Sequence, residues 1–222
     1  MTLATAPELR PTLSTALREG SRAEHEQAEN SPFMSELLEG GLAPEAYADL
    51  LMRLRIVYEA LEATVRTLAE DALVSALYDP ALERLAAIDA DLTWWAPDRS
   101  LEPVDSPAAY AYADRLRSAA SWGGLVLAHH YTRYLGDLSG GQVIGRMLQR
   151  TYDLPAGRGV AFYSFPAIAK PKPYKDRYRA RLDALPLSPS DVARAVEETR
   201  VAFALNRALF AELGQNLDAY RR

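Results

Sequence analysis

No cysteine occurs among the 222 residues of this chain. Its absence excludes disulfide bonds, zinc–thiolate sites, iron–sulfur clusters and thiolate nucleophiles. Long hydrophobic runs are missing too. The first sixteen residues lack the apolar core of a signal peptide, and no stretch approaches the length of a membrane span. We therefore expect a soluble, cytoplasmic protein without a membrane anchor.

Strong charge of either sign is also lacking. The formal net charge is −5 and charged residues make up 25% of the chain, so the composition gives no case for a nucleic-acid partner. A hydrophobic content of 49% is ordinary for a globular protein. We expect a single domain over residues 1–222, with a structured core from about 10 to 215, short polar termini and a monomeric state.

The alternating polar and apolar residues that half-buried β-strands require are not found. Apolar residues recur instead with helical spacing, as in the stripe of Leu50, Leu51, Leu54, Val57, Tyr58, Leu61 and Val65. Serine or aspartate followed by proline marks helix starts at 31–32, 79–80, 106–107 and 188–189, and Pro44 marks another. The segment 154–173 is rich in proline, glycine and aromatics and is typical of a long connection. The predicted fold class is all-α.

One helical stretch, residues 129–142, carries an unusual number of glycines. Gly136, Gly140 and Gly141 lie within it, and Gly145 follows. Each interior glycine costs about 1 kcal/mol of helix propensity relative to alanine, which a fold tolerates where a helix bends or where its backbone must approach something closely. Gly136 and Gly140 share one helix face, and Asp137 stands on the neighbouring face. The pattern predicts a carboxylate beside bare backbone, against which a large flat group could lie.

The first predicted helix, residues 12–29, places His25 and Glu29 four residues apart on one face. A carboxylate there can accept the Nδ1 proton of the imidazole and leave Nε2 free as a metal ligand. Arg18 lies seven residues earlier on the same predicted face, about 10 Å along the axis. An exposed histidine with a surface ion pair explains this helix equally well, and both interpretations stay open on these residues alone.

The other histidines, His129 and His130, are adjacent and face different directions, so one helix cannot present both to one metal. A ferritin-type di-iron site would need Glu-x-x-His motifs, and no glutamate lies three residues before any histidine. We expect both to be ordinary packing or surface residues. Residues 138–142 match the signature of ABC-transporter ATPases, but the chain has no Gly-Lys pair and therefore no phosphate-binding loop, so we interpret the match as chance.

Basic residues gather in one place within this acidic chain. They are Lys170, Lys172, Lys175, Arg177, Arg179 and Arg181. Lys175 and Arg179 share a helix face at i, i+4. A solvated helix face is the common meaning of such a run. The alternative is a docking site for carboxylates or phosphates, which would agree with the position of Arg18.

Together these residues resemble the heme oxygenase family. One matching segment holds Leu17-Arg18-Glu19 and His25-Glu26-Gln27-Ala28-Glu29-Asn30. The other holds Ala128-His129 and Tyr131-Thr132-Arg133-Tyr134-Leu135-Gly136-Asp137-Leu138-Ser139-Gly140-Gly141-Gln142, which is similar to the distal-helix motif of the family. The resemblance implies one all-α domain that sandwiches heme between a proximal and a distal helix.

The resemblance also implies site residues. It makes His25 the proximal iron ligand, with Glu29 as its neighbour. It assigns the distal face to Gly136, Gly140 and the water-mediated proton donor Asp137. It assigns the surroundings of the heme propionates to Arg18, Tyr131, Lys175 and Arg179. It assigns the distal polar network to Tyr58 and Arg133, and the pocket wall and nearby network to Phe203, Asn206 and Phe210.

The implied activity is O2-dependent degradation of heme, which is both substrate and cofactor, to biliverdin, carbon monoxide and ferrous iron. The arrangement of Arg18, Lys175 and Arg179 favours the α-isomer. Since the chain has no flavin or nicotinamide fingerprint, a separate reductase or ferredoxin is expected to supply electrons. Two alternatives stay open on the sequence: a heme carrier or sensor without turnover, and a helical peroxidase. Neither the physiological electron donor nor the biological use of the products follows from these residues.

Overall fold

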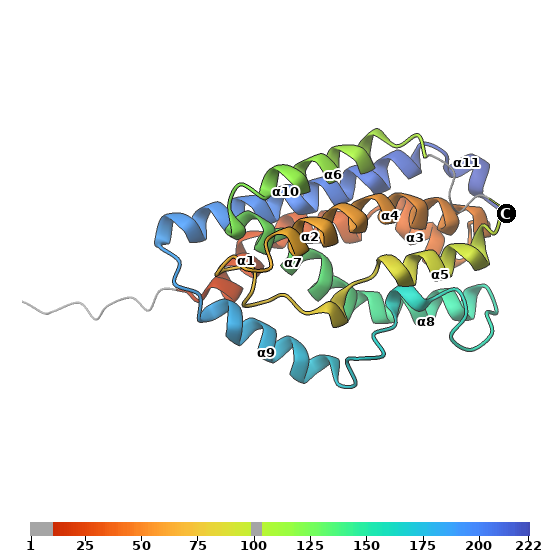
Figure 1. The fold of residues 1–222 in the computed structure, drawn as a ribbon. Coiled ribbons are helices and arrows are strands. Elements are labelled where there is room, and N and C mark those ends of the chain that lie inside the picture. The colour runs from red at the N-terminus through yellow and green to blue at the C-terminus, as the bar shows by residue number, and fades with distance from the viewer. Residues whose placement is uncertain (1–10, 99–103) are drawn as a thin grey trace, which may run out of the picture.

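The computed structural model describes residues 11–98 and 104–222, which fold as an all-α protein (Figure 1). The longer helices are α1 (Leu13–Gly20), α2 (Arg22–Glu29), α3 (Pro32–Glu39), α4 (Pro44–Thr67), α5 (Leu85–Trp95), α6 (Pro107–Ala119), α7 (Gly123–Gly136), α8 (Gln142–Thr151), α9 (Pro171–Asp183) and α10 (Pro189–Gly214). The short elements are η1 (Pro80–Leu82), η2 (Asp137–Gly141), η3 (Ala161–Tyr163) and α11 (Leu217–Tyr220). The predicted fold class is confirmed.

Proline opens helices where the sequence predicted it. Prolines stand in the first turn of α3, α4, α6 and α10, and the side chains of Ser106 and Ser188 accept the expected hydrogen bonds from backbone N–H groups. Asp79 also caps with its side chain, but Pro80 begins only the short η1. No helix within residues 11–98 and 104–222 has both the length and the apolar character needed to cross a bilayer.

The predicted first helix, residues 12–29, is wrong in one respect, because it is broken at Ser21. The hydroxyl of Ser21 donates to the Leu17 carbonyl at 2.7 Å and so takes up an acceptor at the end of α1. Gly20 lies so close to α10 that a Cβ there would be 2.5 Å from Cγ1 of Val196. Arg18 and His25 therefore lie on separate helices, and the predicted 10 Å spacing along one axis does not apply.

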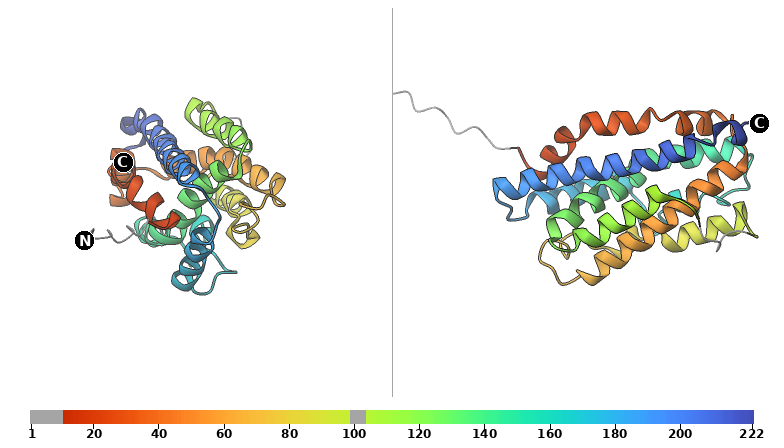
Figure 2. Two further views of the ribbon diagram at one scale, coloured as in Figure 1. Left: turned by 90° about the vertical axis from the view of Figure 1, so that its left-hand side faces the viewer. Right: turned by 90° about the horizontal axis from the view of Figure 1, so that it is seen from above.

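The core is formed around two long helices, α4 and α10. Helix α4 packs on α5 and α6, and α10 packs on α7 and α6. Tyr47, Tyr58, Tyr112, Tyr134, Tyr178, Phe33 and Phe162 are the large aromatic side chains that are fully buried. Seen from above, α10 has α1 and α2 along one side and α6 along the other (Figure 2). The two halves of the broken first helix thus lie at the edge of the core.

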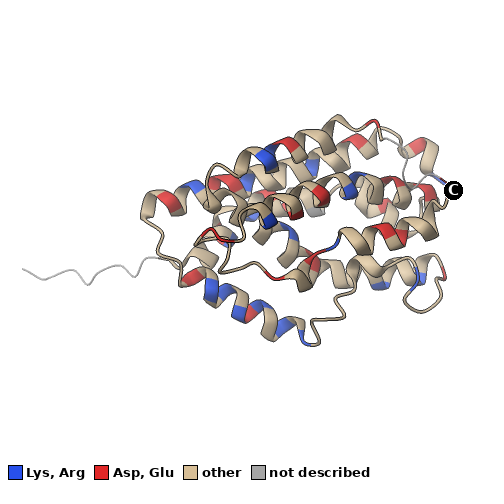
Figure 3. Cartoon of the chain, viewed as in Figure 1, with Lys and Arg blue, Asp and Glu red and all other residues tan. Residues whose placement is uncertain are grey.

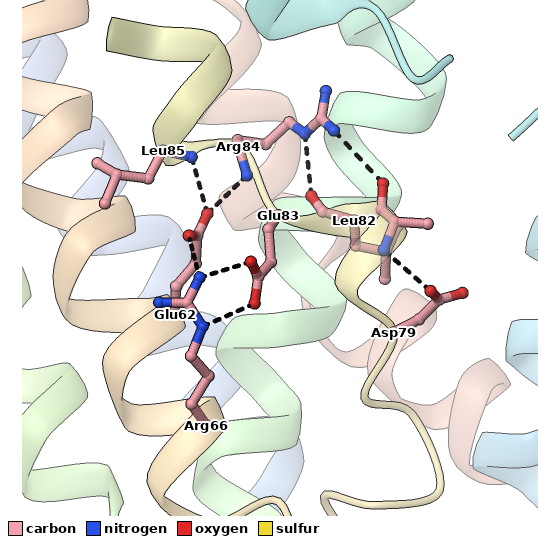
Figure 4. Close-up of polar contacts among 8 residues, drawn as sticks. Glu62, Arg66, Asp79, Leu82, Glu83, Arg84 and Leu85 are labelled. Atoms are coloured by element: carbon pink, nitrogen blue, oxygen red, sulfur yellow. Dashed lines mark hydrogen bonds and ion pairs between the residues drawn. The ribbon is translucent and has the colours of Figure 1, made fainter. Parts of the chain in front are cut away.

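Buried carboxylates fix the connections beside α5. Glu62, which is 2% exposed, accepts hydrogen bonds from the backbone N–H groups of Arg84 at 2.6 Å and Leu85 at 2.9 Å (Figure 4). It thereby takes up unpaired donors at the start of α5, where negative charge is favoured. Arg66 forms ion pairs with both Glu62 and Glu83. This anchoring holds Arg84 in the interior, close to the site described next.

Candidate active site

The four glycines at 136, 140, 141 and 145 serve two different purposes. A Cβ built on Gly136 or Gly140 would meet nothing within 4 Å, and both residues are exposed. A Cβ on Gly141 or Gly145 would instead lie 3.0 or 2.9 Å from the side chain of Tyr163. The first pair leaves a strip of open backbone on one face, as the sequence predicted. The second pair lets the helix pack closely on the segment that carries Tyr163.

Between α7 and α8 the helix widens into the single π-helical turn η2, and the axis changes direction there (Figure 1). π-Turns inside α-helices are rare and cluster at functional sites. Here the turn coincides with Gly136, Gly140 and Gly141, whose missing side chains make the local backbone easy to deform. The predicted bend is therefore present, and Asp137 is its first residue.

The carboxylate of Asp137 lies inside the protein, at 6% exposure, in a network of residues from four elements. The Tyr58 hydroxyl of α4 donates a hydrogen bond to Oδ2 of Asp137. Arg133 places Nη2 3.8 Å from Oδ1 and donates from Nε to the Tyr58 oxygen at 3.0 Å. Its Nη1 donates to Oδ1 of Asn206 on α10 at 2.6 Å. The structure thus brings together four predicted residues from distant parts of the chain.

The electrostatic balance at Asp137 favours a carboxyl that can hold a proton. Burial raises its pKa above the ordinary value, while the positive charge of Arg133, the Tyr58 hydrogen bond and the charge of Arg84 act in the opposite direction. Burial also raises the pKa of Tyr58 well above 10, so that phenol stays neutral and donates. The hydrogen bond from Tyr58 and the ion pair with Arg133 hold this carboxyl in one orientation.

Cationic side chains from α1 and α9 surround Tyr131 of α7. Burial raises the pKa of Tyr131, and the charges of Arg179 and Arg18 counteract it, which indicates that both guanidinium groups are close. Lys175 donates from Nζ to the Ser139 hydroxyl at 2.7 Å, next to Gly140. Lys and Arg residues recur along α9 (Figure 3). Lys175 thus lies beside the glycine strip, while Arg18 pairs with Glu19 at 2.9 Å on the surface. A cationic rim of Arg18, Lys175 and Arg179 next to Tyr131 stays a prediction.

The residues expected on the opposite side lie on α2 and α10. The imidazole of His25 is exposed and meets the Phe203 ring edge-on, with 5.4 Å between ring centroids. Phe210, one turn past Asn206, is half-buried and packs against the hydrophobic core. The side chain of Glu29 lies outside what the structure describes, so the predicted pairing of His25 with Glu29 stays a prediction.

The other two histidines are structural, and they are buried packing residues rather than surface ones. His129 places Nε2 2.7 Å from a Glu198 oxygen, and Arg115 binds the same carboxylate. His130 shares a 2.8 Å hydrogen bond with the Tyr178 hydroxyl. Burial lowers the pKa of both imidazoles, that of His130 to about 3. The prediction that neither serves the site agrees with these contacts.

Two contributors to the site were missed at the sequence level. Tyr163 supports the distal helix through Gly141 and Gly145, and its carbonyl accepts a 2.5 Å hydrogen bond from Gln142. Arg84, which is 5% exposed, adds a positive charge near Asp137. Tyr163 sits in a connection without periodicity, and Arg84 follows no motif. The excess of aromatics in residues 154–173 was the only available signal.

The arrangement fits a heme group. A flat macrocycle needs a face without side chains, which Gly136 and Gly140 leave open. Its two carboxylates need cations at one edge, and Arg18, Lys175 and Arg179 are the residues predicted to supply them. Its iron needs a neutral imidazole, and His25 presents an exposed ring.

Comparison with known proteins also indicates a protein that acts on heme. The family model for heme oxygenase matches residues 11–212. Human heme oxygenase 1 is 39% identical over 209 residues, which cover 92% of this chain and 73% of that protein. Heme oxygenase 2 of Synechocystis sp. is 39% identical over 206 residues, which cover 90% of this chain and 82% of the relative.

Solved structures have the same fold. Synechocystis heme oxygenase-2 in complex with heme and NO superposes with a TM-score of 0.89 at 37% identity, covering 94% of this chain and 88% of that one. Heme oxygenase from Leptospira interrogans gives 0.85 at 35% identity and covers 91% and 100%. The family match across most of the chain, with relatives at this level of identity, shows that the chain belongs to the heme oxygenase family of heme-degrading oxidoreductases.

Proposed function

We propose that this protein converts heme, with O2 and electrons from a separate donor, to biliverdin, carbon monoxide and ferrous iron. One observation carries the proposal: the buried carboxyl of Asp137 adjoins a strip of bare helix backbone at Gly136 and Gly140. A protein that only stores heme needs a cleft but has no use for an oriented, protonatable carboxyl at its distal wall. Bound heme supplies the iron that binds dioxygen and the ring that is oxidised.

The distal residues act by orientation and by proton supply. Gly136 and Gly140 would allow a porphyrin to approach the helix backbone. Asp137, whose pKa is raised by burial, would hold and deliver protons on that side of the cleft. Tyr58 and Arg133 hold the carboxyl in place. No side chain at 136 or 140 competes as an acid or base next to the iron.

The remaining predicted residues fix the heme. His25 would hold the iron through a ring nitrogen, and the iron would supply the binding of dioxygen. Arg18, Lys175 and Arg179, with Tyr131, bind the propionates and so set the rotation of the ring in its plane. Phe203 and Phe210 form the apolar wall on α10. We propose that this rotation exposes the α-meso carbon and gives the α-isomer of biliverdin.

The electron donor in this proposal is a separate reductase or ferredoxin, because the sequence carries no flavin or nicotinamide fingerprint. A location in the cytoplasm and a monomeric state stay predictions.

The test is a turnover experiment on the purified protein. Hemin is added at one equivalent, a reductase system is supplied in air, and the Soret band is followed while products are separated and identified. We expect loss of the band and formation of α-biliverdin with release of carbon monoxide. A Soret band that persists while the reductase system turns over would refute the enzyme and favour a carrier or sensor. Peroxide-driven oxidation of added substrates without an open-chain tetrapyrrole would indicate a peroxidase.

A further inference from the structure

Helix α2, which carries His25, has little attachment to the core. Of residues 22–28 only Ala28 is buried. An isolated helix of eight residues is not stable in water, so contacts with neighbours must hold α2 in place. Its main neighbour is α10.

One face of α10 meets α1 and α2. Its members Val196, Arg200, Phe203 and Arg207 follow the spacing 4, 3, 4, which keeps them in one row on a helix. At the start of this row, Gly20 permits the close approach to Val196 noted above. In the middle, the Phe203 ring meets the imidazole of His25.

Two arginines of this row bind the backbone and side chains around α2. Arg200 donates from Nε to the carbonyl of Gly20 at 2.7 Å and lies 3.9 Å from a carboxylate oxygen of Glu24. Gly20 ends α1, where unpaired carbonyls and the helix dipole favour a cation. Arg207, nearly two turns further along α10, donates to the side-chain oxygen of Gln27. The contacts of Arg200 at Gly20 and Glu24 and that of Arg207 at Gln27 therefore lie on either side of His25 along the chain.

The interface that they bridge is loosely packed. A groove of about 410 Å³ lies along it. Its lining consists of Glu24 and Gln27 of α2 and of Glu197, Arg200, Val201, Phe203, Ala204 and Arg207 of α10. Because apolar burial does not fix α2 in one position, polar contacts have a large share in setting its distance from α10. A displacement of α2 would carry the imidazole of His25 with it.

We propose that Arg200 and Arg207 are positioning residues for the iron ligand: they hold α2 on α10 and so set the orientation of His25 toward the heme. The inference rests on the proposed role of His25. Arg200 bonds to the end of α1 and Arg207 bonds to α2, so both act on His25 through the helix that carries it. Their loss should therefore loosen the bond between His25 and the iron while the distal network around Asp137 stays intact.

The test compares wild type with R200Q, R207Q and the double variant. R117Q is the matched control, since Arg117 is an exposed arginine whose ion pair with Asp114 lies within α6. In the heme-free proteins, hydrogen exchange is measured for residues 22–28 and 129–135. We expect the double variant to exchange at least about tenfold faster at 22–28 and to be unchanged at 129–135. R117Q should match wild type at both.

The same variants are then loaded with heme. We expect the iron–histidine stretching band of the ferrous form to shift or broaden in the double variant, and heme to dissociate roughly tenfold faster. Replacing both arginines by lysine, which keeps the charge, should restore part of the wild-type stretching band and dissociation rate. Exchange and a stretching band equal to wild type would overturn the positioning role alone. Absence of the band from wild type would overturn the assignment of His25, and this proposal with it.

Discussion

The two walls of the predicted heme cleft are built differently. On the distal wall, Asp137 and Tyr58 are buried, Arg133 has a side chain only 10% exposed, and the three are bonded to one another. On the proximal wall, His25 stands on a short helix whose side chains are mostly exposed. The distal groups are thus held by the core of the protein, and the proximal ligand is held by contacts at its edge.

This difference suits the distal wall to the chemical step and the proximal wall to heme binding. Groups that must deliver protons in a fixed geometry gain from being preorganised before the substrate arrives. A helix that must admit and release a large flat molecule gains from being loosely attached. Heme itself would supply apolar contact area that α2 lacks. The comparison therefore predicts that changes on the distal wall affect turnover, and that changes on the proximal wall affect binding.

The largest expected effect is that of Asp137→Ala on turnover. Loss of a positioned proton donor should lower the rate of heme degradation roughly 10²-fold, with heme affinity changed less than about threefold. The measurements are single-turnover product yield and heme titration. Asp114→Ala, at an exposed position on α6, is the control. Normal biliverdin yield from Asp137→Ala would refute the proton-delivery role and remove the contrast between the walls.

His25→Ala removes the predicted iron ligand from the proximal wall. We expect heme affinity to fall roughly tenfold or more, since the variant loses an iron–nitrogen bond, and activity to fall with it. Added imidazole should restore part of the native heme spectrum. An unchanged spectrum without imidazole would show that another residue binds the iron, and His129 and His130 would then be candidates.

Acid should destabilise the heme-free protein through the distal helix. Burial lowers the pKa of His130 to about 3 in the fold. The unfolded chain, with an ordinary pKa near 6.5, binds that proton first, so stability is full above 6.5 and falls as the pH drops toward 3. Between pH 7 and pH 5 this single group should reduce the free energy of unfolding by about 2 kcal/mol. Urea unfolding of wild type and His130→Gln at both pH values checks it, and an equal pH dependence in the two proteins would contradict it.

The smallest expected effect distinguishes the two kinds of glycine in the distal helix. Gly140→Ala should stabilise the heme-free protein by roughly 0.5–1 kcal/mol, because alanine favours the helix and its Cβ meets nothing within 4 Å. It should also weaken heme binding. Gly145→Ala should destabilise by roughly 1–2 kcal/mol, because its Cβ would be 2.9 Å from Cβ of Tyr163. Thermal unfolding measures both, and equal signs would contradict the division.

Much of the distal wall could be predicted from the sequence, because its determinants are local. Gly136 and Gly140 are four residues apart, so helical geometry alone places them on one face beside Asp137. The prolines that open α3, α4, α6 and α10 likewise act within one turn of themselves. The resemblance then supplied Tyr58 and Asn206, whose contacts with Arg133 and Asp137 are long-range and follow from no local pattern.

Other features depend on packing between distant segments and could not be predicted. The break at Ser21 depends on the approach of Gly20 to Val196, which is 176 positions away along the chain. Tyr163 and Arg84 reach the site from irregular segments, where no periodicity marks a buried side chain. The attachment of α2 by Arg200 and Arg207 is likewise invisible until α10 is placed beside it.

The contrast between the two walls is tested most directly by hydrogen exchange of the wild-type protein with and without bound heme. We expect heme binding to slow exchange at residues 22–28 at least about tenfold and to change exchange at residues 129–135 less than about threefold. Equal protection of both segments by heme would contradict it, as would a helix α2 already fully protected in the heme-free protein.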